Sequence, residues 1–330
     1  MIKPLHGLRG IAALTVVVGH FTYKGAASLG VVLFFVLSGF LIGKLYMEKD
    51  FTVENIWRYV VARFARVYPL FAIVIIATAL INASTSLDIF GLQLRDVPSH
   101  LLFAGDARTV WTISTEFQFY ALFVVVWALR SRLPSAIAAV LPLLALFIIV
   151  AVLLGTEASR NGIFGYLHIF LVGVLLAIIA GRDDGTYQNI AALAIPLCAV
   201  AYMAAYLLVP QLYQPRWIYL DPVTIAICAS LVISTVVGGN CFANRVLSHP
   251  FPVWLGEISF GVYLLHRHVQ HAVDAVWPGE PSALASFLPK LLLTLLLAQL
   301  ANWLIERPCR AWLRQAGERI NLRNSRAMRN

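Results

Sequence analysis

Charged residues are scarce in this sequence, and hydrophobic ones dominate it. Asp, Glu, Lys and Arg make up 12% of the 330 residues, whereas hydrophobic residues make up 60%. The mean hydropathy is +0.80. A soluble globular protein of this length needs far more charge to cover its surface. The composition therefore excludes a soluble globular protein and predicts an integral membrane protein.

Cysteines are also few, and their placement excludes the usual cysteine-based sites. Of the four, Cys198 and Cys228 lie inside apolar runs, and Cys241 and Cys309 lie near the ends of such runs. This spacing fits neither a metal site nor a disulfide framework, so we expect no bound metal. The net charge of +9 does not indicate a nucleic-acid partner, because the basic residues lie between apolar runs rather than on one patch with interleaved aromatics.

Long apolar runs fill most of the sequence. Ten of them approach the ~20 residues that a helix needs to cross a bilayer. They lie at about Leu8–Tyr23, Gly30–Tyr46, Val67–Ser84, Val110–Leu129, Ser135–Leu154, Gly162–Ala180, Asn189–Val209, Pro222–Gly238, Phe251–Gln270 and Leu284–Leu304. The first run lacks a small-residue cleavage site after it, which favours a retained span over a signal peptide. We therefore expect an all-α bundle of about ten transmembrane helices, with both termini on one side.

Lysine and arginine indicate the side on which the termini lie. Eighteen of the 25 basic residues fall on the face that carries both termini, and seven fall on the other. By the positive-inside rule, this distribution predicts cytoplasmic termini and a multi-pass protein of the cytoplasmic membrane. We expect residues 1–306 to form the membrane domain and residues 307–330 to form a basic cytoplasmic tail on anionic lipid.

The first apolar run contains two ionisable residues, Arg9 and His20. Eleven residues separate them, which is about three helical turns, so both side chains point to one face. They are roughly 16 Å apart along the helix axis, at opposite depths of one span. Because ionisable groups are costly in lipid, they predict a polar interior and a functional site.

Three further titratable residues share the predicted outer depth of His20. Glu116, His168 and His266 each lie near the outer end of a different run, as a shared cavity requires. A lone intramembrane histidine can instead hydrogen-bond a neighbouring helix, and this alternative stays open for His20 and for His168. Glu116 needs a partner at such a depth, because an isolated carboxylate is costly there.

Two tyrosines accompany these residues. Tyr120 lies one turn from Glu116 on the same helical face. Ser259, Tyr263 and His266 follow an i, i+4, i+7 spacing and form a polar stripe on the ninth run. The stripe fits a packing seam between helices nearly as well as it fits a substrate site.

The cytoplasmic end of the third run is basic. Arg63 and Arg66 are one turn apart there, and Arg9 is predicted at the same depth. Charge counting alone favours the interpretation that Arg63 and Arg66 are topology anchors. The alternative is a phosphate clamp for a nucleotide or coenzyme A, because paired guanidinium groups suit phosphate better than lysines do.

These residues carry a resemblance to the membrane acyltransferase-3 family that spans nearly the whole chain. The opening run L-H-G-L-R-G-I-A-A-L-T-V-V-V-G-H resembles that family's first helix, with its arginine and histidine at Arg9 and His20. The other similar segments are Gly30–Ile42, Arg63–Leu70 with its Arg-x-x-Arg motif, Trp111–Tyr120 around Glu116, Gly256–His266 and Glu306–Pro308. Each segment alone is weakly specific, but six in order are a strong indication.

The resemblance implies an O-acyltransferase that moves an acyl group, commonly acetyl, from a cytoplasmic donor to a carbohydrate, glycolipid or other hydroxyl acceptor. We expect acetyl-CoA or another acyl-CoA as a co-substrate, and no permanently bound cofactor. His20 is the best general base, because a neutral imidazole can accept a hydroxyl proton. A transient acyl-histidine is the variant mechanism.

The remaining site residues have supporting roles in this hypothesis. Glu116 orients His20 or holds the acceptor. The residues expected to bind substrates are Arg9, Arg63, Arg66, Tyr120, Tyr263 and His266.

Two hypotheses compete with acyl transfer. A proton-coupled transporter or a flippase of lipid-linked sugars would use the same His and Glu residues as a proton relay. Such a protein has no reason to bind coenzyme A through Arg63 and Arg66. A non-catalytic membrane partner of a polysaccharide-synthesis complex is the other hypothesis, and it predicts that His20 can be replaced without loss of function.

Overall fold

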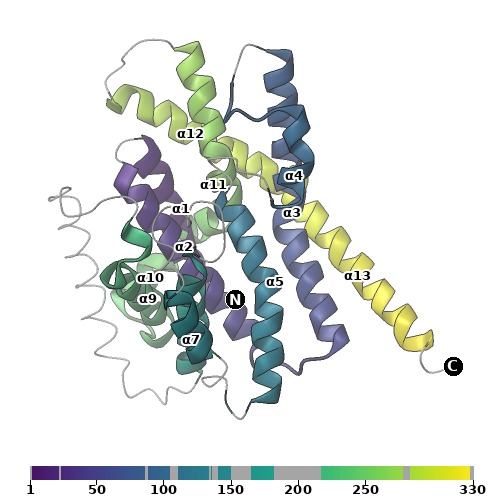
Figure 1. Ribbon diagram of the computed structural model, residues 1–330. Helices are drawn as coiled ribbons and strands as arrows, with labels where there is room; N and C mark the ends of the chain where they lie inside the picture. Colours follow the sequence, from purple (N-terminus) through teal and green to yellow (C-terminus); the bar gives the residue numbers. More distant parts are fainter. Residues whose placement is uncertain are drawn as a thin grey trace.

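The computed structural model describes residues 2–21, 24–85, 88–104, 111–133, 135, 140–149, 165–181, 217–277 and 283–327. All regular structure in these residues is helical (Figure 1). The longer helices are α1 (Lys3–Phe21), α2 (Lys24–Tyr46), α3 (Val53–Ser84), α5 (Trp111–Arg132), α7 (Leu167–Ala180), α9 (Pro222–Val237), α11 (Pro250–Val276), α12 (Ala283–Ala301) and α13 (Arg307–Ala327). The shorter ones are η1 (Leu94–Asp96), α4 (Val97–Leu101), Val140–Ile149, η4 (Trp217–Tyr219), α10 (Phe242–Leu247) and η5 (Asn302–Glu306).

Several of these helices are suited to a membrane. Four are long and apolar enough to cross it, and they are Ala27–Tyr46, Val53–Ser84, Trp111–Arg132 and Ser286–Gly317. Shorter apolar helices cover Val140–Ile149, Leu167–Ala180 and Pro222–Val237. The helices α1 and α11 cover the first and ninth predicted runs. The seventh predicted run, at about 189–209, lies outside the described residues, so the count of ten stays a prediction.

The helix α3 begins well before the third apolar run. Thr52 caps it, because its side chain accepts a hydrogen bond from the backbone N–H of Asn55 at 3.2 Å. Arg63 and Arg66 therefore lie within one continuous helix of 32 residues, rather than in a loop before it. Because they are three residues apart, they share one face of α3.

Glycines let the helices around α1 and α2 approach closely. A Cβ on Gly256 of α11 would lie 2.0 Å from the backbone oxygen of His6, and one on Gly10 of α1 would lie 2.6 Å from a backbone oxygen of α11. A Cβ on Gly39 of α2 would lie 2.0 Å from the backbone oxygen of Phe170 in α7. Small residues permit such contacts between membrane helices. This packing holds the polar residues of α1 and α11 next to one another.

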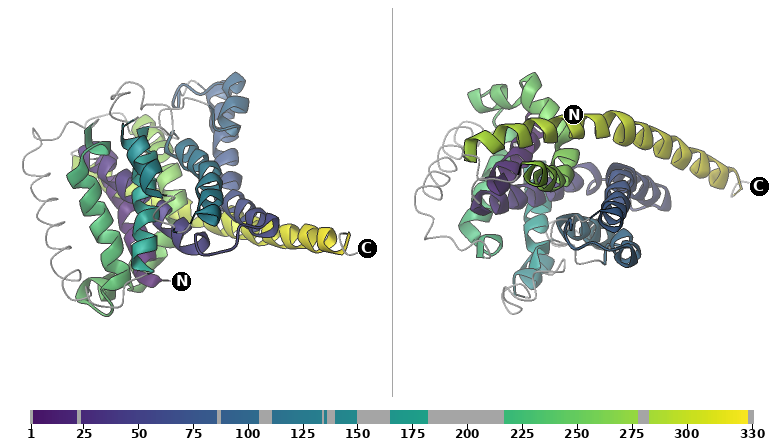
Figure 2. Two further views of the ribbon diagram at one scale, coloured as in Figure 1. Left: turned by 60° about the horizontal axis from the view of Figure 1, so that its bottom comes forward. Right: turned by 90° about the horizontal axis from the view of Figure 1, so that it is seen from above.

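The C-terminal residues continue the last predicted span as a helix. The chain passes from α12 through the π-helical turn η5 directly into α13. Figure 2 shows α13 running outward from the bundle to the C-terminus. The helix packs against α3, so it joins the part of the bundle that carries Arg63 and Arg66.

Cysteine labelling tests the predicted orientation of the chain. In a background without native cysteines, a single cysteine at Asp96 should react with an impermeant thiol reagent added to intact cells. One at Asn324 should react only after the membrane is opened, because the termini are predicted to be cytoplasmic. Opened cells, in which both sites should react, serve as the control. The reverse pattern in intact cells would place the termini outside.

Candidate active site

A cavity of about 460 Å³ lies between α1, α2, α3, α5 and α13. Its basic lining residues are His6, Arg9, Lys44, Arg63, Arg66 and Arg314. Glu116 is the one acidic residue among the described residues of its lining. We call this space the basic cavity. Clustered guanidinium groups suit a ligand with several negative charges, above all phosphates.

Aromatic side chains hold Arg63 at the wall of the basic cavity. Its guanidinium lies over the ring of Tyr120, 5.8 Å from the centroid, in a cation–π arrangement. The Tyr59 hydroxyl donates to the backbone oxygen of Tyr120 at 2.9 Å and so ties α3 to α5. The buried Nε of Arg63 has no hydrogen-bond partner within the described part of the chain. Arg63 is therefore held at the cavity wall by the Tyr120 ring rather than by a hydrogen bond of its Nε.

His6 adds polarity to the cavity without a full charge. It precedes the first predicted span and lies near Arg66. Burial, and then the charge of Arg66, lower the pKa of the His6 imidazole. His6 is therefore neutral at pH 7, and the arginines and Lys44 carry the positive charge of the cavity.

Glu116 stands between the basic cavity and a second, smaller one. The Ser38 hydroxyl donates to Oε1 of Glu116 at 2.9 Å, and the Tyr120 hydroxyl donates to the same oxygen at 2.5 Å. The smaller cavity, of about 30 Å³, is lined by Arg9, Ser38 and Glu116 as well, together with Tyr263. We call it the inner pocket. The carboxylate that the sequence predicts to need a partner thus has two, at the junction of the two spaces.

A pair of histidines lies beyond the inner pocket. The rings of His20 in α1 and His266 in α11 are 5.1 Å apart between centroids. The ring of Tyr263 is 5.7 Å from that of His266, and the Thr112 hydroxyl donates to the Tyr263 hydroxyl at 2.5 Å. Tyr263 therefore connects the inner pocket to the histidine pair.

The hydrogen bonds of His266 determine its tautomer. Its Nδ1 lies 2.5 Å from the backbone oxygen of Tyr263, which can only accept, so Nδ1 carries the proton of the neutral ring. Nε2 is then an acceptor, and it is buried without a hydrogen-bond partner among the described residues. His266 is thus held in one tautomer, with the lone pair of its ring on the buried Nε2.

The structure divides the residues that the sequence predicts to share one layer. His20 and His266 lie together, whereas Glu116 lines both cavities with Arg9, which is about three turns from His20 on α1. His168 lies neither beside the histidine pair nor at the cavities of Glu116 and Arg9. Its Nε2 lies 2.9 Å from the backbone oxygen of Tyr219, and it lines another cavity with residues such as Val172 and Pro222. This contact favours the packing role for His168.

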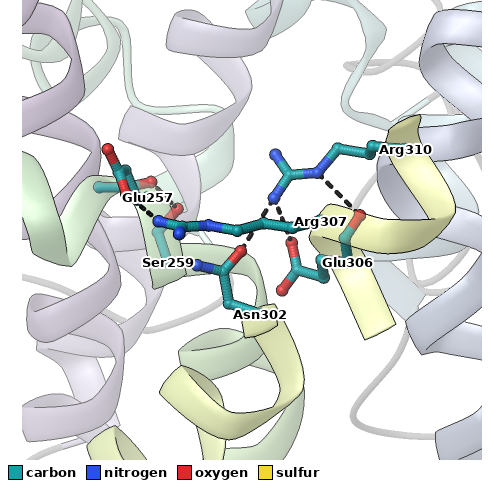
Figure 3. A network of polar contacts seen from close by, with 7 residues as sticks. Glu257, Ser259, Asn302, Glu306, Arg307 and Arg310 are labelled. Carbon is teal, nitrogen blue, oxygen red and sulfur yellow. Dashed lines mark hydrogen bonds and ion pairs between the residues drawn. The ribbon is translucent and has the colours of Figure 1, made fainter. Parts of the chain in front are cut away.

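A polar network joins α11 to the start of α13 (Figure 3). Arg307 donates to Glu257 at 2.9 Å, and Arg310 donates to the Asn302 side chain at 2.9 Å. Arg310 also lies 3.7 Å from the carboxylate of Glu306, which is 3% exposed. Asn302 and Glu306 are the first and last residues of the π-helical turn η5, and both are buried. Such turns often occur at functional sites.

Sequence reasoning missed several residues of this site. Ser38 is a single small polar residue in an apolar run, and nothing in the run marks it as the partner of Glu116. Lys44 and Arg314 belong to the eighteen basic residues on the face that carries both termini, and charge counting does not reveal which of these side chains face inward. Glu306 was noted only as part of a family-like motif.

The fold and the site define a helical membrane protein in which a basic cavity meets a hydrogen-bonded carboxylate, with a histidine pair beyond it. The family model of the acyltransferase domain (acyltransferase-3) matches residues 2–303. The chain belongs to this family, as the sequence motifs predict. No solved structure shows significant similarity to the chain.

Curated relatives extend the comparison. YrhL of Bacillus subtilis is 27% identical over 94% of this chain and 55% of its own length. The peptidoglycan O-acetyltransferase OatA of Listeria monocytogenes is 23% identical over 94% of this chain and 56% of its own length. The O-acetyltransferase OatA of Staphylococcus aureus is 24% identical over 93% of this chain and 57% of its own length. The chain thus spans little more than half the length of the curated relatives it matches.

Proposed function

We propose that this protein is an O-acyltransferase of the cytoplasmic membrane. It moves an acetyl group from a cytoplasmic acyl-CoA to a hydroxyl of a carbohydrate or glycolipid. The observation that carries this proposal is the basic cavity, in which Arg9, Arg63 and Arg66 gather around the hydrogen-bonded carboxylate of Glu116. The names of the relatives, two of which name peptidoglycan as the acceptor, support a carbohydrate acceptor.

The basic cavity suits the donor. Its volume of about 460 Å³ is within the range of small-molecule sites. The phosphates of coenzyme A would bind the guanidinium groups of Arg63 and Arg66, which share one face of α3. The acyl end would then point toward Glu116 and the inner pocket. Guanidinium groups bind phosphate with paired hydrogen bonds, which fixes the donor's orientation.

The transfer step follows from this placement. The acceptor oxygen attacks the carbonyl carbon of the thioester, and His20 takes the proton of the acceptor hydroxyl. The carbon–sulfur bond breaks, and coenzyme A leaves as a thiol with the proton that His20 returns. In the variant mechanism, the acyl group passes first to a histidine nitrogen and then to the acceptor. Glu116 holds the acceptor hydroxyl or the acyl end at the junction of the two cavities.

The competing functions have less support. A transporter or flippase needs a proton relay but has no need for a phosphate-binding cavity, and family membership favours acyl transfer over transport. Of the groups that such a relay would use, Glu116 lines the basic cavity, and the histidine pair lies beyond the inner pocket. Polysaccharide-synthesis proteins that supply the acceptor are the partners that this function implies.

Removing Arg66 tests the donor site. Arg66→Ala should weaken acetyl-CoA binding by about tenfold or more, because a hydrogen bond to a charged group contributes roughly 1.5–3 kcal/mol. The remaining binding should also depend less on salt. Calorimetry on the purified protein measures both effects. Arg58→Ala, which removes an exposed arginine of the same helix paired with Glu54, is the matched control. Equal acetyl-CoA affinities for the two variants would contradict the donor site and support the interpretation of Arg66 as a topology anchor.

A further inference from the structure

The helix α13 lies beyond the residues that the family model matches, yet it contributes to the basic cavity. The match ends at residue 303, whereas Arg314 lines the cavity together with Arg63, Arg66 and Lys44. The sequence alone assigns this helix to a basic tail on anionic lipid. Its place in the structure indicates another role.

Two sets of contacts fix α13 in this position. At its start, Arg307 is paired with Glu257 of α11, and Arg310 is bound to Asn302 and Glu306 of the π-helical turn (Figure 3). The Arg307–Glu257 pair joins α13 to α11, whereas the contacts of Arg310 lie within the continuous helical segment formed by η5 and α13.

The second contact lies further along the helix. Gly317 packs directly on α3, since a Cβ there would lie 3.1 Å from a methyl carbon of Val61. Gly317 is three residues after Arg314, so both lie on one face of α13. The face of α13 that packs on α3 therefore also carries Arg314, which lines the basic cavity.

We infer that Arg314 is a phosphate-binding residue of the donor site and that α13 closes one wall of that site. This inference rests on the proposed acyl-CoA donor. Arg314 lines the same cavity as Arg9 and Glu116, and Glu116 is the one acidic side chain among its described lining residues. An additional guanidinium there would contact one of the phosphates of coenzyme A. A phospholipid headgroup offers the same chemistry, so the test must separate the two sources.

The binding of acetyl-CoA is therefore measured in nanodiscs of purely zwitterionic lipid, which separates coenzyme A from an anionic lipid headgroup as the ligand of Arg314. Arg314→Ala should weaken the affinity by about tenfold. Gly317→Leu should weaken it as well, because the larger side chain pushes α13 off Val61. Arg245→Ala, which removes an exposed arginine of α10 outside the cavity lining, should leave it unchanged. The thermal stability of each variant, with and without phosphatidylglycerol, is measured in parallel.

The outcomes are distinct. Weaker acetyl-CoA binding by Arg314→Ala in zwitterionic discs supports the inference. Unchanged acetyl-CoA affinity, with loss of the stabilisation by phosphatidylglycerol, would assign Arg314 to lipid and overturn it. If Arg314→Ala and Arg245→Ala are alike in both measurements, the inference is wrong while the proposed function stands. Absence of acetyl-CoA binding by the unaltered protein would instead contradict the proposed function.

Discussion

Replacing His20 with glutamine should lower acyl transfer by about 10²- to 10⁴-fold, which is the usual loss when a general base is removed. Glutamine keeps a polar side chain beside His266 but has no basic nitrogen. Donor binding should stay close to that of the unaltered protein, because the basic cavity lies about three helical turns away, around Arg9. Transfer of labelled acetyl, together with calorimetric acetyl-CoA binding, measures the two effects separately.

Two other histidines supply the comparison. His168→Gln should transfer acetyl at a nearly normal rate, since His168 contacts the backbone of Tyr219 away from both cavities. The transfer rate of His266→Gln should fall between those of the other two variants, because the His266 ring lies 5.1 Å from that of His20. Near-normal turnover by His20→Gln would show that another group is the general base. His266 or Glu116 would then be the better candidate.

Replacing Glu116 with glutamine should separate catalysis from donor affinity. We expect turnover to fall by about 10- to 100-fold, because the charge-assisted hydrogen bonds at the junction become neutral ones. Acetyl-CoA affinity should stay the same or rise, since the substitution removes the one negative charge from the described lining of the basic cavity. Steady-state kinetics with varied acetyl-CoA shows whether kcat falls without a rise in KM.

Ser38 provides a matched control for the Glu116 variant. Ser38→Ala removes one of the two hydrogen bonds that Oε1 of Glu116 accepts but keeps the charge and the Tyr120 contact. It should therefore lower turnover less than Glu116→Gln does. Equal turnover by Glu116→Gln and the unaltered protein would show that the charge of this carboxylate has no part in transfer.

Some of this site could be predicted from the sequence. Helical periodicity placed Arg9 and His20 on one face of α1, and the spacing of Arg63 and Arg66 gave their shared face of α3. Both results need only the geometry of a single helix. The i, i+4, i+7 stripe likewise linked Tyr263 to His266, which lie side by side in the structure.

Relations between helices could not be predicted in this way. Depth along a span does not show which neighbouring helix a side chain faces, and depth alone grouped Glu116 and His168 with His20. The structure instead places Glu116 at the cavity with Arg9 and places His168 against Tyr219. Arg314 lines the basic cavity from a helix that packs on α3, and no pattern within α13 reveals that packing.

The most direct test of the central claim is acetyl transfer by the purified protein in liposomes. Acetyl-CoA labelled in the acetyl group is supplied together with a carbohydrate or glycolipid acceptor, and the product is identified by mass spectrometry. We predict that the label appears as an ester on an acceptor hydroxyl, in proportion to free coenzyme A released, and that His20→Gln abolishes both. Acceptor movement across the bilayer without ester formation or release of coenzyme A would contradict the account and favour a transporter.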